Sequence, residues 1–563
     1  MQSTMMREPL STNHFLERAG KIFPTGQIVS RLPDKSLVSH TYADFYRRSR
    51  QLAAGLQALG ISKGERVATL CWNHHVHLEC YFGIPAMGAV MHTLNLRLSP
   101  SEIAWIVNDA QDSVLIIDDI LLPLYAQFAD QVSFEQVIVF NFSRSAVAPA
   151  FANLASLDYE ELLARAPANF GYAEHDENDA IAACYTSGTT GRPKGVVYSH
   201  RSAVLHTLVA SLSDFWGLQG RDVVLPVTPM FHANCWGIPY GAVMMGAKLV
   251  FPGPHLGAHD LLDLMQLEPP TLSLGVPTIW LSVIQTFEAN PGKWQMPVMR
   301  SLVGGAAVPE ALIRAFARNG VSIVQGWGMT ETSPLATVSY LKSELRGISD
   351  DEQFRRKSMA GVPAPLVSIR IIGEDENGAA LTQEQVWDGI AVGEIQVRGP
   401  FITGEYYSGE INTGQSSSVA SDSNPSAFDN ATKFTADGWL RTGDVATIDP
   451  HGYLRITDRT KDLIKSGGEW ISSVDLENAL MGHSSIAEAA VIAVPDDKWS
   501  ERPIACVVLK AGDKVTSEQL QQLLLAKGFA KWQLPDRYEW ITQVPKTSTG
   551  KFWKAKLREQ FPK

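Results

Sequence analysis

A loop crowded with hydroxyl groups and glycines separates two apolar runs of this 563-residue chain, Ala180 to Tyr185 and Val196 to Tyr198. Glycine lets a backbone approach an oxyanion closely, and hydroxyl groups and an ammonium group donate hydrogen bonds to it. The loop therefore predicts a phosphate-binding site between two strands. Its members are Thr186, Ser187, Gly188, Thr189, Thr190, Gly191 and Lys194.

The loop differs from the P-loop of nucleoside triphosphatases, which requires the pattern G-x-x-x-x-G-K-[ST] at the start of a helix. Gly188 and Gly191 are too close together for that pattern, and Lys194 is followed by Gly195. On composition alone, a flexible surface turn explains the loop as well as a phosphate site does.

Two further segments end an apolar run in a glycine-containing turn, SLVGGAAVP (301–309) and VQGWGMTETSP (324–334). Ligands of open α/β sheets bind at such strand ends. The backbone of residues 304–306 offers a surface for a flat adenine ring, and Trp327 offers an aromatic face for stacking. Glu331 beside a phosphate site suits Mg²⁺, which prefers carboxylate, phosphate and water oxygens.

Asp444 and Arg459 supply groups suited to a nucleoside within residues 437–473. The Asp444 carboxylate can accept hydrogen bonds from both ribose hydroxyls. The planar guanidinium of Arg459 can donate to ribose or phosphate. Most lone aspartates and arginines lie on the surface, so these two gain meaning only from the segments around them.

Taken together, these segments resemble the adenylate-forming enzymes, which include acyl-CoA synthetases, adenylation domains of peptide synthetases and firefly-type luciferases. The similarity rests on the strings TSGTTGRPKG, GMTE, TGD, DRTKD and PKTSTGK, and it spans roughly residues 40 to 560. It implies an α/β fold with a large N-terminal domain of layered α/β subdomains with parallel sheets and a small, mobile C-terminal α+β domain. The implied domains are residues 1–458 and 462–563, with a hinge at 459–461.

The resemblance also implies catalytic roles for four residues. Lys551, in PKTSTGK, matches a lysine that enters the active site and neutralises charge in the transition state. His232 matches a histidine near the acyl carboxylate, and Thr186 and Glu331 are implied as Mg²⁺ ligands. The nucleotide site implied beyond the phosphate loop consists of Gly304, Gly305, Ala306, Gln325, Gly326, Trp327, Gly328, Met329, Thr330, Asp444 and Arg459.

In this family the small domain rotates between two half-reactions. Lys461 stands at the hinge position, where many relatives carry aspartate. Rotation would withdraw Lys551 and bring a second segment to the site, where two adjacent glycines allow an extended pantetheine arm to pass. That segment is Lys465, Ser466, Gly467, Gly468, Glu469 and Trp470.

The implied reaction joins a small-molecule carboxylic acid to coenzyme A. The acid and ATP give an acyl-adenylate and pyrophosphate, and coenzyme A then gives acyl-CoA and AMP. The strings PMFHANCW and GEWISS most resemble ligases of medium- and long-chain fatty acids, with methylthio-propionate and aryl-alkanoate ligases as alternatives. Residues 226–251 read mostly as core helix, on which His232 and Trp236 would share one face. Trp236 is then either a gate on the acyl tunnel or a core residue.

Other functions stay open at this point. The same adenylation chemistry can serve a carrier protein or, as in luciferases, an oxygenase reaction, and consumption of free coenzyme A distinguishes these cases. A kinase using the glycine-rich loop would release ADP. A non-catalytic nucleotide-binding protein would have no use for Lys551 and Glu331.

Bulk properties describe a multidomain globular protein without a nucleic-acid partner, because the chain is long, 45% apolar and carries a net charge of −11. Neither a signal peptide nor an apolar run of membrane-spanning length is apparent, and the five cysteines lack CxxC spacing. These features predict a cytoplasmic enzyme without a transmembrane segment. The resemblance adds a possible homodimer formed through the N-terminal domain.

Helices and strands alternate along the chain, which predicts layered α/β structure. The histidines at 74, 75 and 77 have no cysteine or carboxylate at ligand spacing except Glu79, so we expect them to begin a helix. The serine-rich residues 411–428 predict a surface loop. Helices are predicted at 42–60, 103–109, 475–481 and 517–527, and strands at 65–71, 113–117, 136–139, 487–494 and 505–510.

Overall fold

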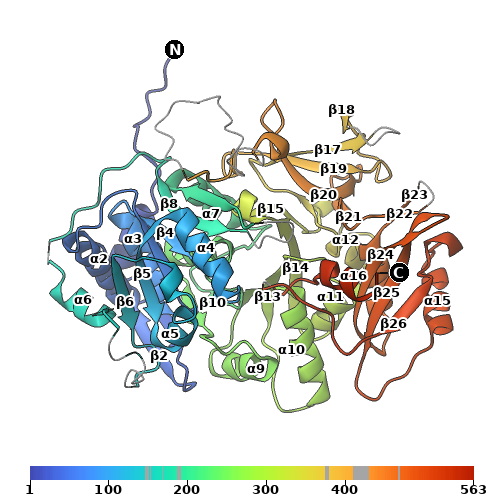
Figure 1. Ribbon diagram of the computed structural model, residues 1–563, viewed down its shortest axis with the longest axis horizontal. Coiled ribbons are helices and arrows are strands. Elements are labelled where there is room, and N and C mark those ends of the chain that lie inside the picture. The colour runs from blue at the N-terminus through green and yellow to red at the C-terminus, as the bar shows by residue number, and fades with distance from the viewer. Residues whose placement is uncertain are drawn as a thin grey trace.

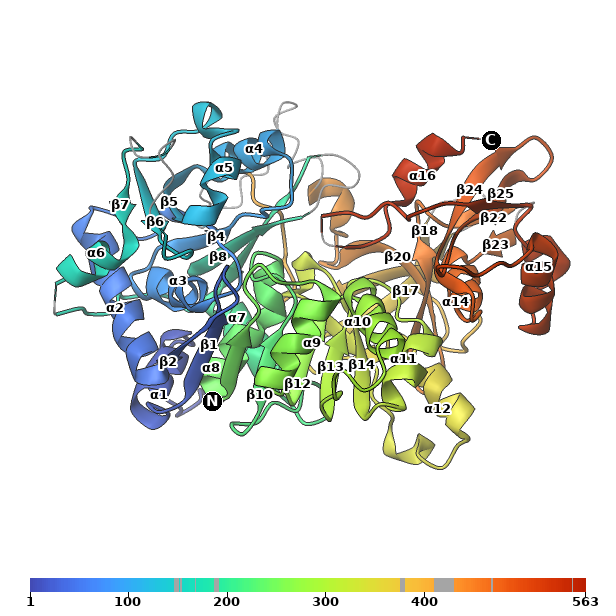
Figure 2. The ribbon, with the colours of Figure 1, turned by 90° about the horizontal axis from the view of Figure 1, so that it is seen from below.

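The computed structural model describes residues 1–145, 151, 154–167, 169–186, 192–374, 380–409, 430–466, 469–548 and 550–562. Within these residues the chain forms four β-sheets, three in the large N-terminal part and one in the small C-terminal part (Figure 1). The C-terminal part, drawn in red, lies beside the middle of the chain in both views (Figures 1 and 2). The fold is mixed α/β.

The first sheet has nine strands in the order β16-β15-β14-β13-β12-β10-β11-β1-β2. The strands from β14 to β1 run parallel, and the antiparallel pairs lie towards the two edges. The strands are β1 (Gln27–Arg31), β2 (Leu37–Thr41), β10 (Val223–Pro226), β11 (Lys248–Phe251), β12 (Leu272–Gly275), β13 (Met299–Val303), β14 (Val321–Gly328), β15 (Leu335–Val338) and β16 (Val362–Pro363).

The second sheet has seven strands in the order β7-β6-β5-β3-β4-β8-β9. All its pairs are parallel except β8 with β9, the two strands that flank the predicted phosphate loop. The strands are β3 (Arg66–Leu70), β4 (Val90–Thr93), β5 (Asp112–Asp118), β6 (Gln136–Phe140), β7 (Leu157–Asp158), β8 (Ala180–Tyr185) and β9 (Gly195–Ser199).

Helices separate and cover these two sheets, because parallel strands need apolar cover on both faces. Side chains of α2, α3, α7 and α8 pack in the core between the sheets. Helices α9 to α11 cover the outer face of the first sheet, and α4 and α5 cover that of the second. The helices are α1 (Asn13–Ile22), α2 (Tyr42–Ala58), α3 (His75–Ala86), α4 (Pro100–Ala110), α5 (Leu122–Tyr125), α6 (Tyr159–Arg165), α7 (His200–Ala210), α8 (Ile238–Met245), α9 (Ala258–Leu267), α10 (Pro277–Ala289), α11 (Glu310–Ala317) and α12 (Asp350–Lys357).

The third sheet is antiparallel throughout, in the order β18-β17-β19-β20-β21, and so departs from the predicted parallel sheets. Short connections join β17 to β18 and β20 to β21, whereas a parallel pair needs a longer crossover. The strands are β17 (Ser368–Glu374), β18 (Ala380–Glu384), β19 (Gly393–Arg398), β20 (Leu440–Ile448) and β21 (Leu454–Arg459).

The C-terminal part builds its own sheet, with β26 parallel to β25 beside the path β23-β22-β25-β24. Helices α14 and α15 pack on it through a separate apolar core. Its elements are β22 (Ile464–Ser466), β23 (Glu469–Ile471), α14 (Ser473–Met481), β24 (Ile486–Asp496), β25 (Ser500–Leu509), α15 (Ser517–Ala526), β26 (Arg537–Trp540) and α16 (Lys554–Gln560).

The helices and strands predicted from periodicity are confirmed, with small shifts at their ends. The helix expected at 42–60 is α2, which stops at Ala58 shortly before Gly60 takes a positive φ of 91°. The other predicted helices are α4, α14 and α15, and the predicted strands are β3, β5, β6, β24 and β25. No helix in the described part of the chain combines the length and apolar character needed to cross a bilayer.

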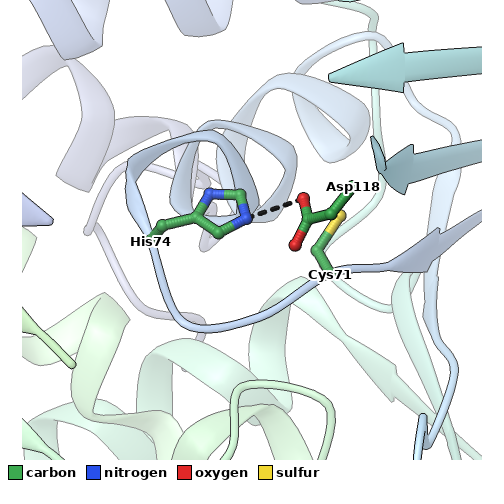
Figure 3. Close-up of side chains that lie close together, drawn as sticks. All are labelled: Cys71, His74 and Asp118. Atoms are coloured by element: carbon green, nitrogen blue, oxygen red, sulfur yellow. Dashed lines mark hydrogen bonds and ion pairs between the residues drawn. The ribbon is translucent and has the colours of Figure 1, made fainter. Parts of the chain in front are cut away.

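The histidine-rich segment begins helix α3, as predicted. His74 is the N-cap, and its Nδ1 accepts a hydrogen bond from the His77 backbone N–H at 3.4 Å. Its Nε2 lies 2.8 Å from Asp118 Oδ1, and the Cys71 thiol is close by (Figure 3). Sequence spacing missed Cys71 and Asp118 as neighbours of this ring because strand pairing brings Asp118 to it. Since both ring nitrogens already bond within the protein, the group ties the start of α3 to the end of β5.

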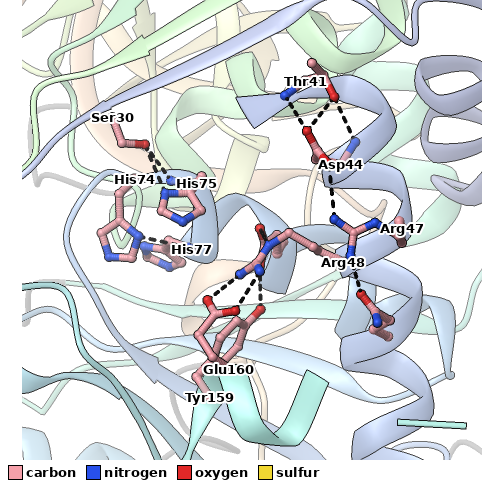
Figure 4. Close-up of polar contacts among 12 residues, drawn as sticks. Ser30, Thr41, Asp44, Arg47, Arg48, His74, His75, His77, Tyr159 and Glu160 are labelled. Carbon is pink, nitrogen blue, oxygen red and sulfur yellow. Dashed lines mark hydrogen bonds and ion pairs between the residues drawn. The ribbon is translucent and has the colours of Figure 1, made fainter. Parts of the chain in front are cut away.

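Glu79, the carboxylate next to the histidines, belongs to a different network. Arg48 Nε donates to Glu79 Oε1 at 2.7 Å, and the same guanidinium pairs with Glu160 at 2.7 Å. The Tyr159 hydroxyl donates to Glu79 as well, at 2.7 Å. Figure 4 shows Arg48 reaching from α2 towards Glu160 and Tyr159 of α6. This buried ion pair is fully hydrogen-bonded and connects α2, α3 and α6.

Candidate active site

A cavity of about 1780 Å³ is lined by both the N-terminal and the C-terminal parts of the chain. The carboxyl ends of β13 and β14 open onto it, as expected for ligand sites of α/β sheets. Most of the residues predicted for the site line this one cavity. They are Thr186, Lys194, His232, Trp236, Gly304, Gly305, Ala306, Gln325, Gly326, Trp327, Gly328, Met329, Thr330, Glu331, Asp444, Arg459, Lys461 and Lys551.

The predicted phosphate loop connects two antiparallel strands, β8 and β9, as its flanking apolar runs indicate. Thr186 and Lys194 close its base, because the Thr186 N–H donates to Lys194 O at 2.9 Å and the Lys194 N–H donates to Thr186 Oγ1 at 3.1 Å. Five predicted members lie outside the described residues: Ser187, Gly188, Thr189, Thr190 and Gly191. Gly467, Gly468 and the serine-rich residues 411–428 lie outside them too.

The ends of β13 and β14 come so close that side chains have no room there. A Cβ atom on Gly304 would lie 2.7 Å from Gly326 O, and one on Gly328 would lie within bonding distance of Pro334 O. Trp327 is 8% exposed, and its indole N–H donates to Asp444 Oδ2 at 2.9 Å. The expectation for Trp327 was stacking alone. The hydrogen bond is an additional contact that fixes the indole beside Asp444.

Glu331 lies in a short 3₁₀ turn, Thr330–Thr332, and is only 5% exposed. Its backbone oxygen accepts a hydrogen bond from Thr403 N–H at 2.8 Å. Its carboxylate oxygen Oε1 accepts one from the Tyr406 hydroxyl at 2.6 Å. A buried carboxylate on a cavity wall, with its turn fixed by hydrogen bonds, has the chemistry of a cation ligand.

Asp444 and Arg459 are opposite each other on the antiparallel strands β20 and β21. Arg459 Nε is 3.4 Å from Asp444 Oδ1. Asp444 is nearly buried, whereas the Arg459 side chain is 42% exposed. Because both line the cavity next to Trp327, they form the polar wall predicted for a nucleoside.

Lys551 reaches this cavity from the C-terminal part. Its Cε is 3.6 Å from the position of a Cβ atom on Gly305. Removal from water, helped by the positive charge of Arg459, lowers the pKa of Lys551 to about 8, against the opposite effect of Asp444 and Glu331. The ammonium group is therefore beside the candidate metal ligand and nucleoside wall.

The segment that carries Lys551 is fastened to the N-terminal part by hydrogen bonds. Asn95 Nδ2 donates to Ser548 Oγ at 3.1 Å, and Arg97 donates to Ser548 O at 3.3 Å. Thr278 Oγ1 donates to Gly550 O at 3.2 Å. Sequence reasoning missed these contacts because neither side carries a pattern that points to the other.

The segment around His232 and Trp236 corrects the sequence analysis. Residues Ala233 to Trp236 have positive φ angles of 43° to 57°, so they form a left-handed turn, and helix α8 begins only at Ile238. Bonds to the core outweigh the strain of this turn, among them Cys235 Sγ to Thr228 O at 3.1 Å. The two side chains therefore share no helix face.

His232 and Trp236 nevertheless line the same cavity. The Trp236 ring is 3.7 Å from the position of a Cβ atom on Gly304, so it lies against the glycine turn after β13. Removal from water lowers the pKa of His232 to about 3, and the charge of Lys551 acts in the same direction. His232 is therefore a neutral ring at physiological pH.

The second predicted face of the C-terminal part lies apart from the cavity lining. Lys465, Ser466, Glu469 and Trp470 are on β22 and β23, and none of them lines the cavity. Lys465 Nζ lies 4.2 Å from the centroid of the Trp470 ring, and Ser466 Oγ accepts a hydrogen bond from Arg502 at 2.9 Å. In this structure Lys551 lines the cavity, whereas the β22–β23 face does not.

Comparisons with known proteins agree with this geometry. Residues 17–407 match a family model described as AMP-binding enzyme, and residues 475–551 match the AMP-binding enzyme C-terminal domain. The chain is 48% identical to a long-chain-fatty-acid–CoA ligase of Thermus thermophilus, with 99% of this chain and 97% of that protein covered.

Two further relatives carry different substrate names. A 3-methylmercaptopropionyl-CoA ligase of Ruegeria lacuscaerulensis is 38% identical, with 100% and 99% of the two chains covered. A medium-chain-fatty-acid–CoA ligase of Ectopseudomonas oleovorans is 36% identical, with 100% and 98% covered. Among solved structures, an anthranilate CoA ligase in complex with anthranoyl-AMP aligns with a TM-score of 0.81 at 23% identity, covering 100% of this chain and 99% of that one. This last similarity concerns the fold.

Proposed function

The chain belongs to the AMP-binding enzyme family and is an AMP-forming acyl-CoA ligase, and from this premise we propose that its substrate is a medium- to long-chain fatty acid. One observation carries the assignment of the site. Segments as far apart in sequence as Thr186 and Lys551 line one cavity, in which an ammonium group faces carboxylates and a nucleoside-type wall.

In the proposed first half-reaction, a carboxylate oxygen attacks the α-phosphorus of ATP, and the bond to the β-phosphate oxygen breaks to release pyrophosphate. Both reactants are anions, so the reaction needs charge neutralisation and alignment. The Lys551 ammonium would neutralise charge that develops on the reacting oxygens. Trp327, Asp444 and Arg459 would hold the adenosine part, and Lys194 would donate to the phosphates.

We assign the magnesium site to Thr186 and Glu331. Their hydroxyl and carboxylate oxygens are hard donors, both residues line the cavity, and few protein ligands suffice for Mg²⁺. Mg²⁺ bound there would neutralise charge on the departing pyrophosphate.

For the second half-reaction we propose rotation about Lys461, within a hinge at 459–461 between domains 1–458 and 462–563. Lys461 lines the cavity, whereas the face with Lys465, Ser466, Glu469 and Trp470 must turn to reach it. The thiol of coenzyme A would then attack the acyl carbonyl, its proton would leave to solvent, and the carbonyl–phosphate oxygen bond would break to release AMP.

The fatty-acid substrate is supported by the named relatives and by the cavity size. A short thioether acid stays the second candidate because the methylmercaptopropionyl-CoA ligase covers the whole chain. Aryl-alkanoates and a carrier protein as acceptor stay predictions. So do a homodimer, which sedimentation would test, and a cytoplasmic location.

The test is incubation of the purified protein with ATP, Mg²⁺ and acids from methylthio-propionate to palmitate, with and without coenzyme A. AMP, pyrophosphate and acyl-CoA are measured. We expect AMP release that depends on coenzyme A and peaks at a medium or long chain. A peak at methylthio-propionate would select the second candidate, pyrophosphate without acyl-CoA would indicate another acceptor, and ADP would refute the ligase.

A further inference from the structure

A short strap, residues 401–407, crosses between the two ATP-binding segments. The Thr403 N–H donates to Glu331 O at 2.8 Å, and the Tyr407 N–H donates to Gly195 O at 2.9 Å. Ser333 Oγ donates to Phe401 O at 2.7 Å. The strap thus connects the turn that carries Glu331 with the first residue of β9, directly after the phosphate loop.

Tyr406 is the strap residue that points into this junction, and it is 4% exposed. Its hydroxyl donates to Glu331 Oε1 at 2.6 Å. The Lys194 ammonium lies 5.0 Å from the centroid of its ring, within the range of a cation–π contact. One side chain therefore contacts both the candidate metal ligand and the loop lysine.

The position of Tyr406 is itself fixed. Its N–H donates to Asn430 Oδ1 at 2.8 Å, and Asn430 Nδ2 donates back to Tyr406 O at 3.3 Å. The ring also packs edge-on against Phe434, with centroids 6.0 Å apart. Such bonds hold the hydroxyl in one place before any ligand binds, which is the requirement for a preorganised site.

We propose that Tyr406 is a positioning residue for the ATP and metal site. Its hydroxyl holds one carboxylate oxygen of Glu331, so that Oε2 is the oxygen left for the cation, and its ring keeps the Lys194 ammonium beside the phosphate loop. The proposal rests on the function proposed above, because it concerns the same ATP and Mg²⁺ site. It assigns two separable tasks to one side chain.

The two tasks can be measured without turnover, by calorimetric titration of ATP in the absence of a carboxylic acid. Each protein is titrated once with Mg²⁺ and once with EDTA. The ratio of the two dissociation constants isolates what the metal contributes to ATP binding.

Tyr406→Phe removes the hydroxyl and keeps the ring. We expect the benefit of Mg²⁺ to fall about tenfold, the loss typical of one hydrogen bond to a charged group, with binding in EDTA unchanged. Tyr406→Leu removes the ring as well, so binding in EDTA should also weaken, by about threefold for one cation–π contact. Melting temperatures of both variants show whether the fold is intact.

Tyr198→Phe is the matched control. Tyr198 is 5% exposed, and its hydroxyl donates to the backbone oxygen of Thr330, next to Glu331, at 2.8 Å. Loss of this hydroxyl should leave the ratio unchanged, because no carboxylate oxygen is released. An equal loss in Tyr198→Phe and Tyr406→Phe would assign the effect to the turn and overturn the role of Tyr406.

Failure of the two proposals is distinguishable. A wild-type protein that binds ATP equally with Mg²⁺ and with EDTA would refute the magnesium site and the role of Tyr406 together. A wild-type protein that needs Mg²⁺, combined with a Tyr406→Phe variant of unchanged ratio, would overturn only the role of Tyr406.

Discussion

Two lysines three positions apart, Lys551 and Lys554, occupy opposite electrostatic environments. Lys551 faces the cavity, where removal from water lowers its pKa to about 8. Lys554 Nζ lies 2.7 Å from Glu477 Oε1 and also donates to Ser473 Oγ, whose hydroxyl in turn donates to Asp458. Burial lowers the pKa of Lys554 too, but the charges of Glu477 and Asp458 outweigh it and hold the pKa above its ordinary value.

The difference separates a lysine available for chemistry from a lysine committed to structure. A desolvated ammonium that gains its counter-charge only when a ligand binds can respond to charge in a reaction. An ammonium in a preformed carboxylate cluster stabilises the fold instead. The Lys554 cluster also joins α14 and α16 to Asp458 at the end of β21, so it fastens the C-terminal part to the N-terminal part in this arrangement.

The largest expected effect is on catalysis at Lys551. Lys551→Met should slow acyl-adenylate formation about a thousandfold, because one preorganised charged donor is lost. Thioester formation from supplied acyl-adenylate should stay near wild type. At pH 7 the free energy of unfolding should not fall, since the replaced ammonium is held with a lowered pKa.

Single-turnover assays of the two half-reactions and a denaturant titration provide these measurements. Equal loss of both half-reactions would remove the assignment of Lys551 to adenylation alone, and a large loss of stability would erase its contrast with Lys554.

The second effect is on stability at Lys554. Lys554→Met should lower the free energy of unfolding of the C-terminal part by about 3 kcal/mol, because it leaves the nearly buried carboxylate of Glu477 without its cation. Adding Glu477→Gln should recover part of this loss. Thermal unfolding monitored by calorimetry tests both, and an unchanged melting profile would contradict the structural role.

The pH dependence separates the two lysines further. Lys551 must be charged to neutralise the reacting oxygens, so kcat/KM for ATP should fall about tenfold per pH unit above its pKa of about 8. Lys554, whose pKa is raised, should contribute nothing in this range. The same lowered pKa makes stability rise with pH between about 8 and 10.5, because the unfolded chain binds more protons there.

Lys551→Arg is the matched variant for this profile, because arginine stays charged at every pH of the assay. Its activity should be lower but should lack the alkaline decline. A decline that persists in Lys551→Arg would assign the titration to another group.

Local patterns in the sequence were sufficient for the elements and for much of the site. Alternation of helix and strand predicted α4, α14, β3 and β24, because each is encoded by its own apolar spacing. Short strings likewise placed Thr186, Glu331 and Asp444 on one cavity. The strings are local, but the strands that carry them end at the same edge.

What the sequence could not provide depends on contacts between distant residues. Tyr406 and Glu331 are 75 positions apart, and no spacing rule connects them. The spacing of His232 and Trp236 suggested a helix, yet tertiary bonds to residues such as Thr228 hold a left-handed turn there. The antiparallel third sheet escaped prediction because its strands carry no signal of their pairing direction.

The smallest expected effect concerns how firmly Asp444 is held, since its charge raises the pKa of Lys551. Trp327→Phe keeps an aromatic face for stacking and removes the indole N–H that donates to Asp444 Oδ2 at 2.9 Å. KM for ATP should rise about threefold to tenfold, the cost of one hydrogen bond to a carboxylate. The alkaline limb should stay in place, because Arg459 still lies 3.4 Å from Asp444 Oδ1. A shifted limb with unchanged KM would instead mean that Trp327 sets the field at Lys551 and not the grip on the nucleoside.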